Sequence, residues 1–195
     1  MYKVIGKRAS RGFRVLWMLE EIGQPYDHVA CDARSDEALK YNDLGKIPAL
    51  VDGDDVLTDS VAIMTYLGDK HGQLTAPAGT PARARQDAMM LWLIDEFDAI
   101  LWAAAKHGFI FPEPMRVPGI RDSLKGEFER SAAQLSARLE GPFLMGDDMS
   151  IVDIMAVHCL NWSVGAKFPR VDDKLGTWAA GLRDRAAFKA ASELA

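Results

Sequence analysis

The chain contains few cysteines, no long apolar run and no excess of basic residues, and each shortage excludes a class of protein. Its 195 residues include two cysteines, Cys31 and Cys159, which are far apart and form no Cys-x-x-Cys pair. This usage fits a reducing compartment and predicts two small buried side chains rather than a redox pair. A membrane-spanning helix would need about 20 consecutive apolar residues, and none occur here. The formal net charge of −5 argues against general nucleic-acid binding, which ordinarily uses a basic surface.

The remaining composition is that of a globular protein. Hydrophobic residues make up 49% and charged residues 26% of the chain, which is long enough for one large domain or two small ones. The first residues lead directly into a strand-like segment, with no apolar leader after a basic start. We therefore expect a cytoplasmic protein.

The apolar periodicity changes from mixed to purely helical after a linker. Before the linker the pattern predicts elements in the order β-α-β-α-β-β-α, over residues 2–6, 11–22, 26–31, 35–44, 48–51, 56–57 and 60–71. The segment at 73–81 is rich in proline, alanine and threonine and supports no packed element. Helical patterns alone follow, over 82–106, 120–139, 151–162, 174–185 and 186–194. The sequence thus predicts an α/β domain over residues 1–74 and an all-α domain over residues 81–195.

The stretch from Gly45 to Leu50 places a proline at the head of a predicted strand. Pro48 cannot donate a ladder hydrogen bond there. If the Ile47–Pro48 bond is cis, the turn leaves the Ile47 N–H and C=O available to pair with an extended peptide ligand. An ordinary trans bond is the alternative, since only about 5–6% of such bonds are cis.

Asp59 and Ser60 open the helix that follows this strand pair. Either residue can cap the helix, and the N–H groups at a helix start hold a carboxylate well. Asp59 adds a negative charge that can take up an ammonium group, so the turn suits the head of an amino acid. The alternative is an ordinary cap without a ligand.

Three separated segments together resemble the glutathione S-transferase superfamily, in particular its bacterial-like, serine-type cytosolic members. They are the stretch 10–21, the stretch 45–50 with Asp59-Ser60, and the helix start at 150–153. The resemblance covers essentially the whole chain. It implies a thioredoxin-like glutathione-binding domain followed by a helical bundle domain, with an electrophile site between them.

The resemblance assigns the glutathione contacts. Ile47, before Pro48, pairs through its backbone with the cysteinyl part, while Asp59 and Ser60 anchor the γ-glutamyl end. Lys46 and Arg11 lie near the carboxylates of the ligand.

A basic group in the first part of the chain is expected to attract the anionic tripeptide, with a solvated basic face as the alternative; its members are Lys7, Arg8, Arg11 and Arg14. Asp153 resembles the structural capping residue of the family and is left out of the site.

Ser10 lies where the resemblance places the hydroxyl that stabilises the glutathione thiolate. Only the thiolate is nucleophilic, and a free thiol has a pKa of about 8.5, so the anion must be favoured. The tyrosine and cysteine alternatives of the family lack a candidate, because no tyrosine ends the first strand and no cysteine precedes Cys31. We expect Ser10 to be catalytic, with the alternative that it only caps the helix beginning at Arg11.

Four ring-bearing residues lie near the end of the first long helix of the second domain, where the resemblance puts the electrophile pocket. They are Trp102, His107, Phe109 and Phe111, and the alternative is an ordinary core cluster. The four histidines of the chain are scattered and predict no metal site.

The resemblance implies an enzyme of detoxification that conjugates glutathione, as co-substrate, to a small hydrophobic electrophile. Peroxide reduction or isomerisation would use the same thiolate, and a non-catalytic binding or stress protein of the same fold stays open. A homodimer is also implied, through exposed apolar positions of the helices starting at Ser60 and Ala82. Nucleic acid, membrane and metal partners are not expected.

Overall fold

A computed structural model of the chain describes residues 1–194. It divides into two compact units: residues 1–78 together with the segment from Leu182 onward, and residues 79–181. The sequence predicted a single boundary between residues 74 and 81, so the structure differs in assigning the C-terminal helix to the first unit. Within the described residues, no helix combines the length and apolar character needed to cross a membrane.

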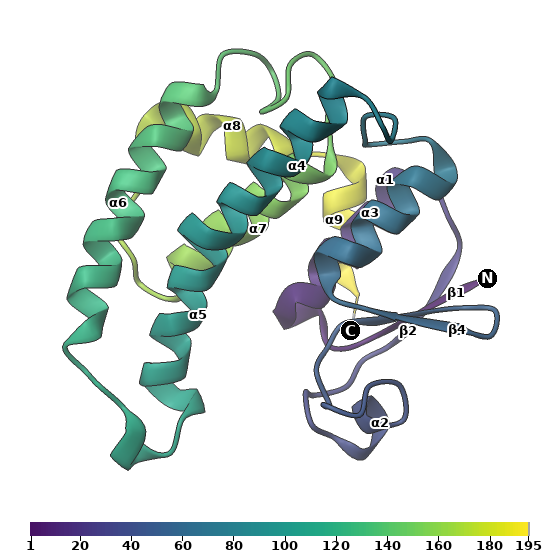
Figure 1. Cartoon of the computed structure of the whole chain (residues 1–195), viewed down its shortest axis with the longest axis horizontal. Coiled ribbons are helices and arrows are strands. Elements are labelled where there is room, and N and C mark those ends of the chain that lie inside the picture. Colours follow the sequence, from purple (N-terminus) through teal and green to yellow (C-terminus); the bar gives the residue numbers. More distant parts are fainter. Residues whose placement is uncertain (195) are drawn as a thin grey trace. The chain divides into compact units, whose positions relative to one another are not determined.

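The first unit is a four-stranded sheet with helices (Figure 1). Its strands follow the order β2-β1-β3-β4, with β1 and β2 parallel and the other pairs antiparallel. The elements are β1 (Tyr2–Ile5), α1 (Phe13–Glu21), β2 (Tyr26–Val29), α2 (Asp36–Leu39), β3 (Ala49–Asp52), β4 (Asp55–Thr58), α3 (Ser60–His71) and α9 (Ala186–Glu193). This thioredoxin-like arrangement confirms the predicted fold class.

The sheet register brings three chain segments to one end of the sheet. Ile5 pairs with Ala49, and Ala49 pairs with Thr58, so these residues form one row across three strands. At this end the chain therefore leaves the sheet after Ile5, enters it again at Ala49 and leaves it after Thr58. The opposite end of β3 and β4 is the tight turn between Asp52 and Asp55.

Helix α1 is almost entirely buried, because it packs against both α3 and α9. Phe188 of α9 packs edge-on against Phe13 and Trp17, with ring centroids 5.1 and 4.9 Å apart. Arg185 forms a bidentate ion pair with Glu21, with its Nε 2.6 Å from Oε1 and its Nη2 2.7 Å from Oε2. These contacts are the physical reason why the end of the chain belongs to the first unit.

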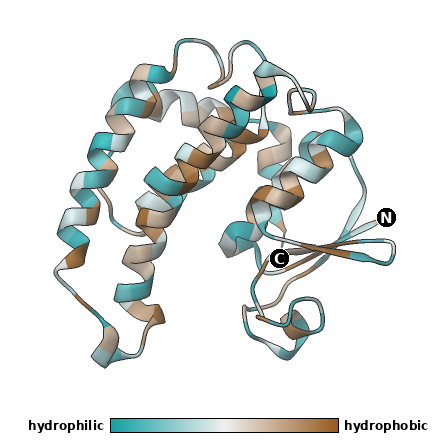
Figure 2. Cartoon of the chain, in the orientation of Figure 1, coloured by the Kyte–Doolittle hydropathy of each residue, from teal (hydrophilic) through white to brown (hydrophobic). Residues whose placement is uncertain are grey.

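The second unit is helical, as the sequence predicted. Its elements are α4 (Pro81–Leu93), a π-helical turn (Ile94–Ala99), α5 (Ile100–Ala105), a second π-helical turn (Lys106–Ile110), a short 3₁₀ turn (Glu113–Met115), α6 (Ile120–Arg138), α7 (Ile151–Gly165) and α8 (Asp173–Arg183), whose last turn passes the boundary. Helix α6 is largely hydrophilic along its length (Figure 2), and its apolar residues Leu124, Phe128 and Leu135 are buried. Phe128 stacks edge-on with Phe97 at 5.5 Å and with Phe168 at 5.4 Å, which builds the aromatic core of the unit.

Candidate functional site

The end of the sheet defined by Ile5, Ala49 and Thr58 gathers the predicted glutathione residues of the first unit. Ser10 lies on the loop that follows β1, Ile47 and Pro48 directly precede β3, and Asp59 and Ser60 directly follow β4. Residues up to 50 positions apart in the sequence therefore lie at one end of the sheet. This convergence is a consequence of strand pairing alone.

Gly6 permits the β1 loop to approach the loop before β3. Its φ is +127°, and a Cβ built on it would lie 2.8 Å from the Cβ of Ile47, closer than side chains tolerate. The carbonyl oxygen of Gly6 also lies 2.8 Å from Nε2 of His28 on β2. Sequence reasoning missed Gly6, although a glycine directly after a strand was a usable signal.

The Ile47–Pro48 peptide bond is cis in the structure. Ile47 lies outside the β1–β3 register, and among the described residues its N–H and C=O have no hydrogen-bond partner. The side chain of Asn42 stabilises this loop: its Nδ2 donates to the Lys46 carbonyl at 3.1 Å, and its Oδ1 accepts from the Leu44 N–H at 3.0 Å. The loop therefore presents the backbone of Ile47 and an exposed Lys46 side chain.

Asp59 is the N-cap of α3. Its Oδ1 accepts from the N–H groups of Val61 at 2.8 Å and Ala62 at 3.2 Å. Its φ of 70° lies in the left-handed region, which costs a residue with a side chain about 1–2 kcal/mol. The exposed carboxyl group and the start of α3 thus lie together, with Ser60 as the first residue of the helix.

Ser60 is buried and is held by Arg14 of α1. Both side chains are almost inaccessible, at 2% and 1% exposure, and Arg14 Nη1 donates to Ser60 Oγ at 3.2 Å. Among Lys7, Arg8, Arg11 and Arg14, Arg14 therefore does not belong to the solvated basic face that the sequence left as the alternative, because its side chain points into the unit. Lys7 forms an ion pair with Asp32, which further reduces this face.

Ser10 caps the helix that carries Arg14. Its backbone is extended, with φ −149° and ψ −174°, and its Oγ accepts from the Gly12 N–H at 3.0 Å. The same oxygen donates to the Lys7 carbonyl at 2.6 Å. The side chain therefore has the capping role that the sequence left as an alternative, and its hydroxyl proton points at a backbone oxygen.

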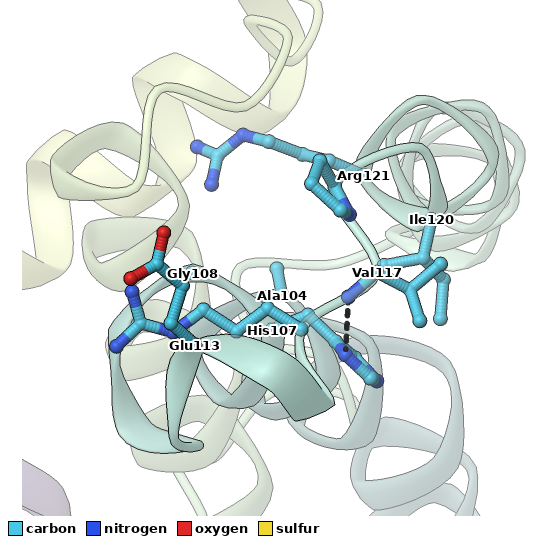
Figure 3. Close-up of a pocket in the computed structure, with 9 residues that line it drawn as sticks. Ala104, His107, Gly108, Glu113, Val117, Ile120 and Arg121 are labelled. Carbon is cyan, nitrogen blue, oxygen red and sulfur yellow. Dashed lines mark hydrogen bonds between the residues drawn. The ribbon is translucent and has the colours of Figure 1, made fainter.

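The predicted electrophile residues lie in the second unit and do not form one cluster. His107 lines a pocket of about 520 Å³, together with Ala104, Gly108, Glu113, Arg116, Val117, Pro118, Ile120 and Arg121 (Figure 3). Its Nδ1 accepts from the Val117 N–H at 3.2 Å, and its ring packs edge-on against Phe111 at 5.2 Å. Trp102, Phe109 and Phe111 are not among the lining residues, and Phe109 is 69% exposed.

Arg116 fixes the turn that carries these residues. It donates to the carbonyl of Phe111 at 2.8 Å and to that of Phe109 at 3.3 Å.

Over residues 1–194, no group of three His, Cys, Asp or Glu side chains is placed to hold a metal ion.

Comparison with known proteins identifies the relatives of this fold and site. The family model for "Glutathione S-transferase, N-terminal domain" matches residues 5–76. A rice protein (Oryza sativa subsp. japonica) named "Probable glutathione S-transferase GSTF1" is 30% identical, over 78% of this chain and 76% of that protein. The chain belongs to the glutathione S-transferase family.

Theta-class members of the family are also similar. Human glutathione S-transferase theta-1 is 32% identical over 74% of this chain, and theta-2 is 32% identical over 68%. The chain spans 64% of the length of the first and 57% of the second, less than two thirds of either.

Solved structures of the family have the same fold. The theta-class glutathione S-transferase of Xanthomonas axonopodis pv. citri, determined with glutathione bound, matches with a TM-score of 0.80 and 25% identity, over 100% of this chain and 98% of that one. The URE2P6 glutathione transferase of Phanerochaete chrysosporium, in complex with oxidized glutathione, matches with a TM-score of 0.82 and 25% identity, over 98% and 94%.

Proposed function

We propose that the chain is a glutathione transferase that activates the thiol of glutathione through Ser10 and conjugates it to a hydrophobic electrophile. The observation that carries this proposal is the convergence of Ser10, Ile47 and Asp59-Ser60 at one end of the sheet. These groups match the functional parts of the tripeptide in kind: a hydroxyl for sulfur, an open backbone for the cysteinyl unit and a helix start for a carboxylate.

Glutathione binds in an extended form in this proposal. Its cysteinyl N–H and C=O pair with the backbone of Ile47, in the manner of a strand added to a sheet edge. Its γ-glutamyl carboxylate meets the N-terminus of α3 at Ser60, where backbone N–H groups and the helix dipole favour an anion. Asp59 takes up the ammonium group, and Lys46 and Arg11 neutralise the remaining carboxylate charge.

Ser10 stabilises the thiolate when its hydroxyl proton changes acceptor, from the Lys7 carbonyl to the sulfur. A hydroxyl has one proton to donate, which is directed to the Lys7 carbonyl at 2.6 Å. Rotation toward a bound thiolate redirects that proton to sulfur and favours the anion. A decrease of about two units in the thiol pKa corresponds to roughly 2.7 kcal/mol, within reach of a hydroxyl, a helix N-terminus and nearby cations together.

The electrophile site is proposed at the turn that carries His107, Phe109 and Phe111, with Trp102 on the helix before it. His107 contributes the part that lines the pocket of about 520 Å³. We further propose that the functional form is a cytoplasmic homodimer, and that neither a metal, nucleic acid nor a membrane takes part.

A second candidate is a protein that binds glutathione without turnover. The Ser10 hydroxyl donates to the Lys7 carbonyl and accepts from the Gly12 N–H within its own loop, as expected for a purely capping serine. In that case Ile47, Asp59 and Ser60 would hold the ligand while its thiol kept an ordinary pKa.

A turnover assay with a substrate panel separates the two candidates. We expect the wild-type protein to consume glutathione in the presence of an aryl halide, an alkyl halide, an unsaturated carbonyl compound or an organic hydroperoxide. Retained glutathione binding by calorimetry with no turnover on the whole panel would favour the non-catalytic candidate. Absence of binding would contradict both.

A further inference from the structure

Helix α1 contains one charged side chain within its buried face. All residues from Phe13 to Leu19 are buried, and Arg14 is the only charged one among them, at 1% exposure. Removing a guanidinium from water is costly, so such a group is retained only where it is well compensated or where its charge is used.

Arg14 joins the two helix starts of the proposed site. Ser10 caps α1, Arg14 lies four residues later, and the side chain reaches Ser60 at the first position of α3. The bond connects residues 46 positions apart, with 3.2 Å between Nη1 and Oγ.

The direction of this bond determines what Ser60 can offer to a ligand. Because Ser60 Oγ accepts from Arg14, the single O–H of the serine is left to be donated elsewhere. A carboxylate at the start of α3 is the matching acceptor. The buried positive charge behind the hydroxyl strengthens this donation, since a charge acts more strongly where water is excluded.

We propose that Arg14 is a positioning residue for the γ-glutamyl carboxylate of glutathione and acts through Ser60. This inference rests on the proposed function. Arg14 touches neither the thiol nor the electrophile; it orients the Ser60 hydroxyl and adds a fixed positive charge to the dipole of α3.

The test compares two ligands on the same variants. One is glutathione, and the other is the analogue with γ-aminobutyrate in place of the γ-glutamyl unit, which lacks only the α-carboxylate. By calorimetry, Arg14→Met should weaken glutathione binding about 10- to 100-fold, the range for a hydrogen bond to a charged group, and should change analogue binding less than about twofold. Arg14→Lys keeps the charge and loses the planar guanidinium, so its affinity for glutathione should lie between those of wild type and Arg14→Met.

Kinetics give a second readout that a loss of stability alone would not produce. The KM for glutathione should rise in Arg14→Met, while kcat at saturating glutathione and the pKa of the bound thiol stay unchanged. Ser60→Ala should show the same dependence on ligand, and the double variant should lose little more than Ser60→Ala alone, because both changes remove one linkage.

Arg83→Met serves as the matched control. Arg83 is also buried, at 9% exposure, but pairs with Asp87 on α4 in the second unit at 2.8 Å. Arg83→Met should lower the stability of the protein, and it should not change the ratio of the affinities for glutathione and the analogue.

The possible outcomes distinguish a failure of the Arg14 role from a failure of the proposed glutathione binding. If wild-type protein binds no glutathione, the proposed function fails. If wild-type protein binds but Arg14→Met loses both ligands equally, Arg14 is structural and the inference is overturned while the function stands. If Arg14→Met does not fold, Arg14→Lys decides by the same ratio: equal loss of the two ligands contradicts the proposal.

Discussion

Two local hydrogen bonds of the Ser10 hydroxyl differ in whether a bound thiolate would compete with them. Its oxygen donates to the Lys7 carbonyl and accepts from the Gly12 N–H. The capping bond requires only the oxygen lone pair, whereas stabilisation of sulfur requires the proton. The two roles therefore use different parts of the hydroxyl, and one side chain can fulfil both.

Ser10→Ala should lower the conjugation rate at pH 7 severalfold, up to about 10-fold, because about one of the roughly two pKa units of thiolate stabilisation is lost with the hydroxyl. It should also destabilise the protein by about 1 kcal/mol through loss of the cap. The ultraviolet absorbance of the thiolate, titrated against pH in the complex, measures the first effect.

Ser35→Ala is the control for this change. Ser35 makes similar local bonds as the N-cap of α2, donating to the Asp32 carbonyl at 2.7 Å and accepting from the Ala38 N–H at 3.2 Å. It should show a similar loss of stability with an unaltered thiolate titration. Equal titrations for Ser10→Ala and wild type would remove Ser10 from the mechanism and leave it as a cap.

At the scale of elements, α7 depends on a buried capping box. Ser150 and Asp153 cap each other as the sequence predicted, and Asp153 also accepts from the Leu144 N–H at 2.8 Å. Asp153 is completely buried, and this burial raises the pKa of its carboxyl group above the ordinary value of 3.8, although four hydrogen bonds to the carboxyl group oppose the shift. The carboxyl group fixes both the start of α7 and the loop before it.

Asp153→Asn should destabilise the protein by about 1–3 kcal/mol, because one acceptor oxygen is lost inside the unit. The difference should also depend on pH. The folded-state pKa is raised, so the stabilising contribution of the carboxyl group is complete below about pH 4 and declines as the pH rises through the folded value. Urea unfolding of both proteins from pH 4 upward should therefore show a shrinking advantage of wild type; an advantage that grows with pH would contradict this account.

Helix α9 stabilises the first unit by covering α1. Phe188→Ala should cost about 2–4 kcal/mol, since the ring is half-buried against Phe13 and Trp17. Lys189→Ala on the same helix removes only an exposed pair with Asp184 and should change stability by less than about 0.5 kcal/mol. Equal unfolding free energies for the two variants would show that α9 contributes little to this unit.

The elements and the site were predictable from the sequence to different degrees. Local patterns were sufficient for the strands, for α1, α3 and α7, and for the cap at Ser150, because each is determined by neighbouring residues. The burial of Arg14 was not predictable, since its partner Ser60 lies 46 residues further along the chain, at the start of α3. The close approach of Gly6 to Ile47 likewise depends on strand pairing that no local pattern encodes.

At the scale of the whole molecule, the net charge of −5 opposes an anionic ligand. Binding of glutathione must therefore depend on local cations and helix ends and not on the overall field. We therefore expect Lys46, which the proposal places near the ligand, to matter more for affinity than the total charge, and added salt to weaken binding.

Leu91 is the strongest marker of a subunit interface among the predicted positions on α4, because a leucine at 65% exposure is costly to leave in water. We expect the chain to form a homodimer with twice the mass of 21.5 kDa, and Leu91→Glu to shift it toward the monomer. Light scattering after size-exclusion chromatography measures both. Ala133→Glu, at an exposed position on α6, is the control; a monomeric wild type would contradict the expectation.

We expect glutathione to bind at the end of the sheet where β1, β3 and β4 meet the loops carrying Ser10, Ile47 and Ser60. Backbone amide spectra of labelled wild-type protein, recorded during a glutathione titration, test it most directly. Binding at this end of the sheet should give saturable shifts that concentrate in residues 6–12, at 47 and 49, and in residues 59–61, with little change in the 52–55 turn at the opposite end. Shifts that do not saturate, or that centre on that turn or lie only in the second unit, would contradict it.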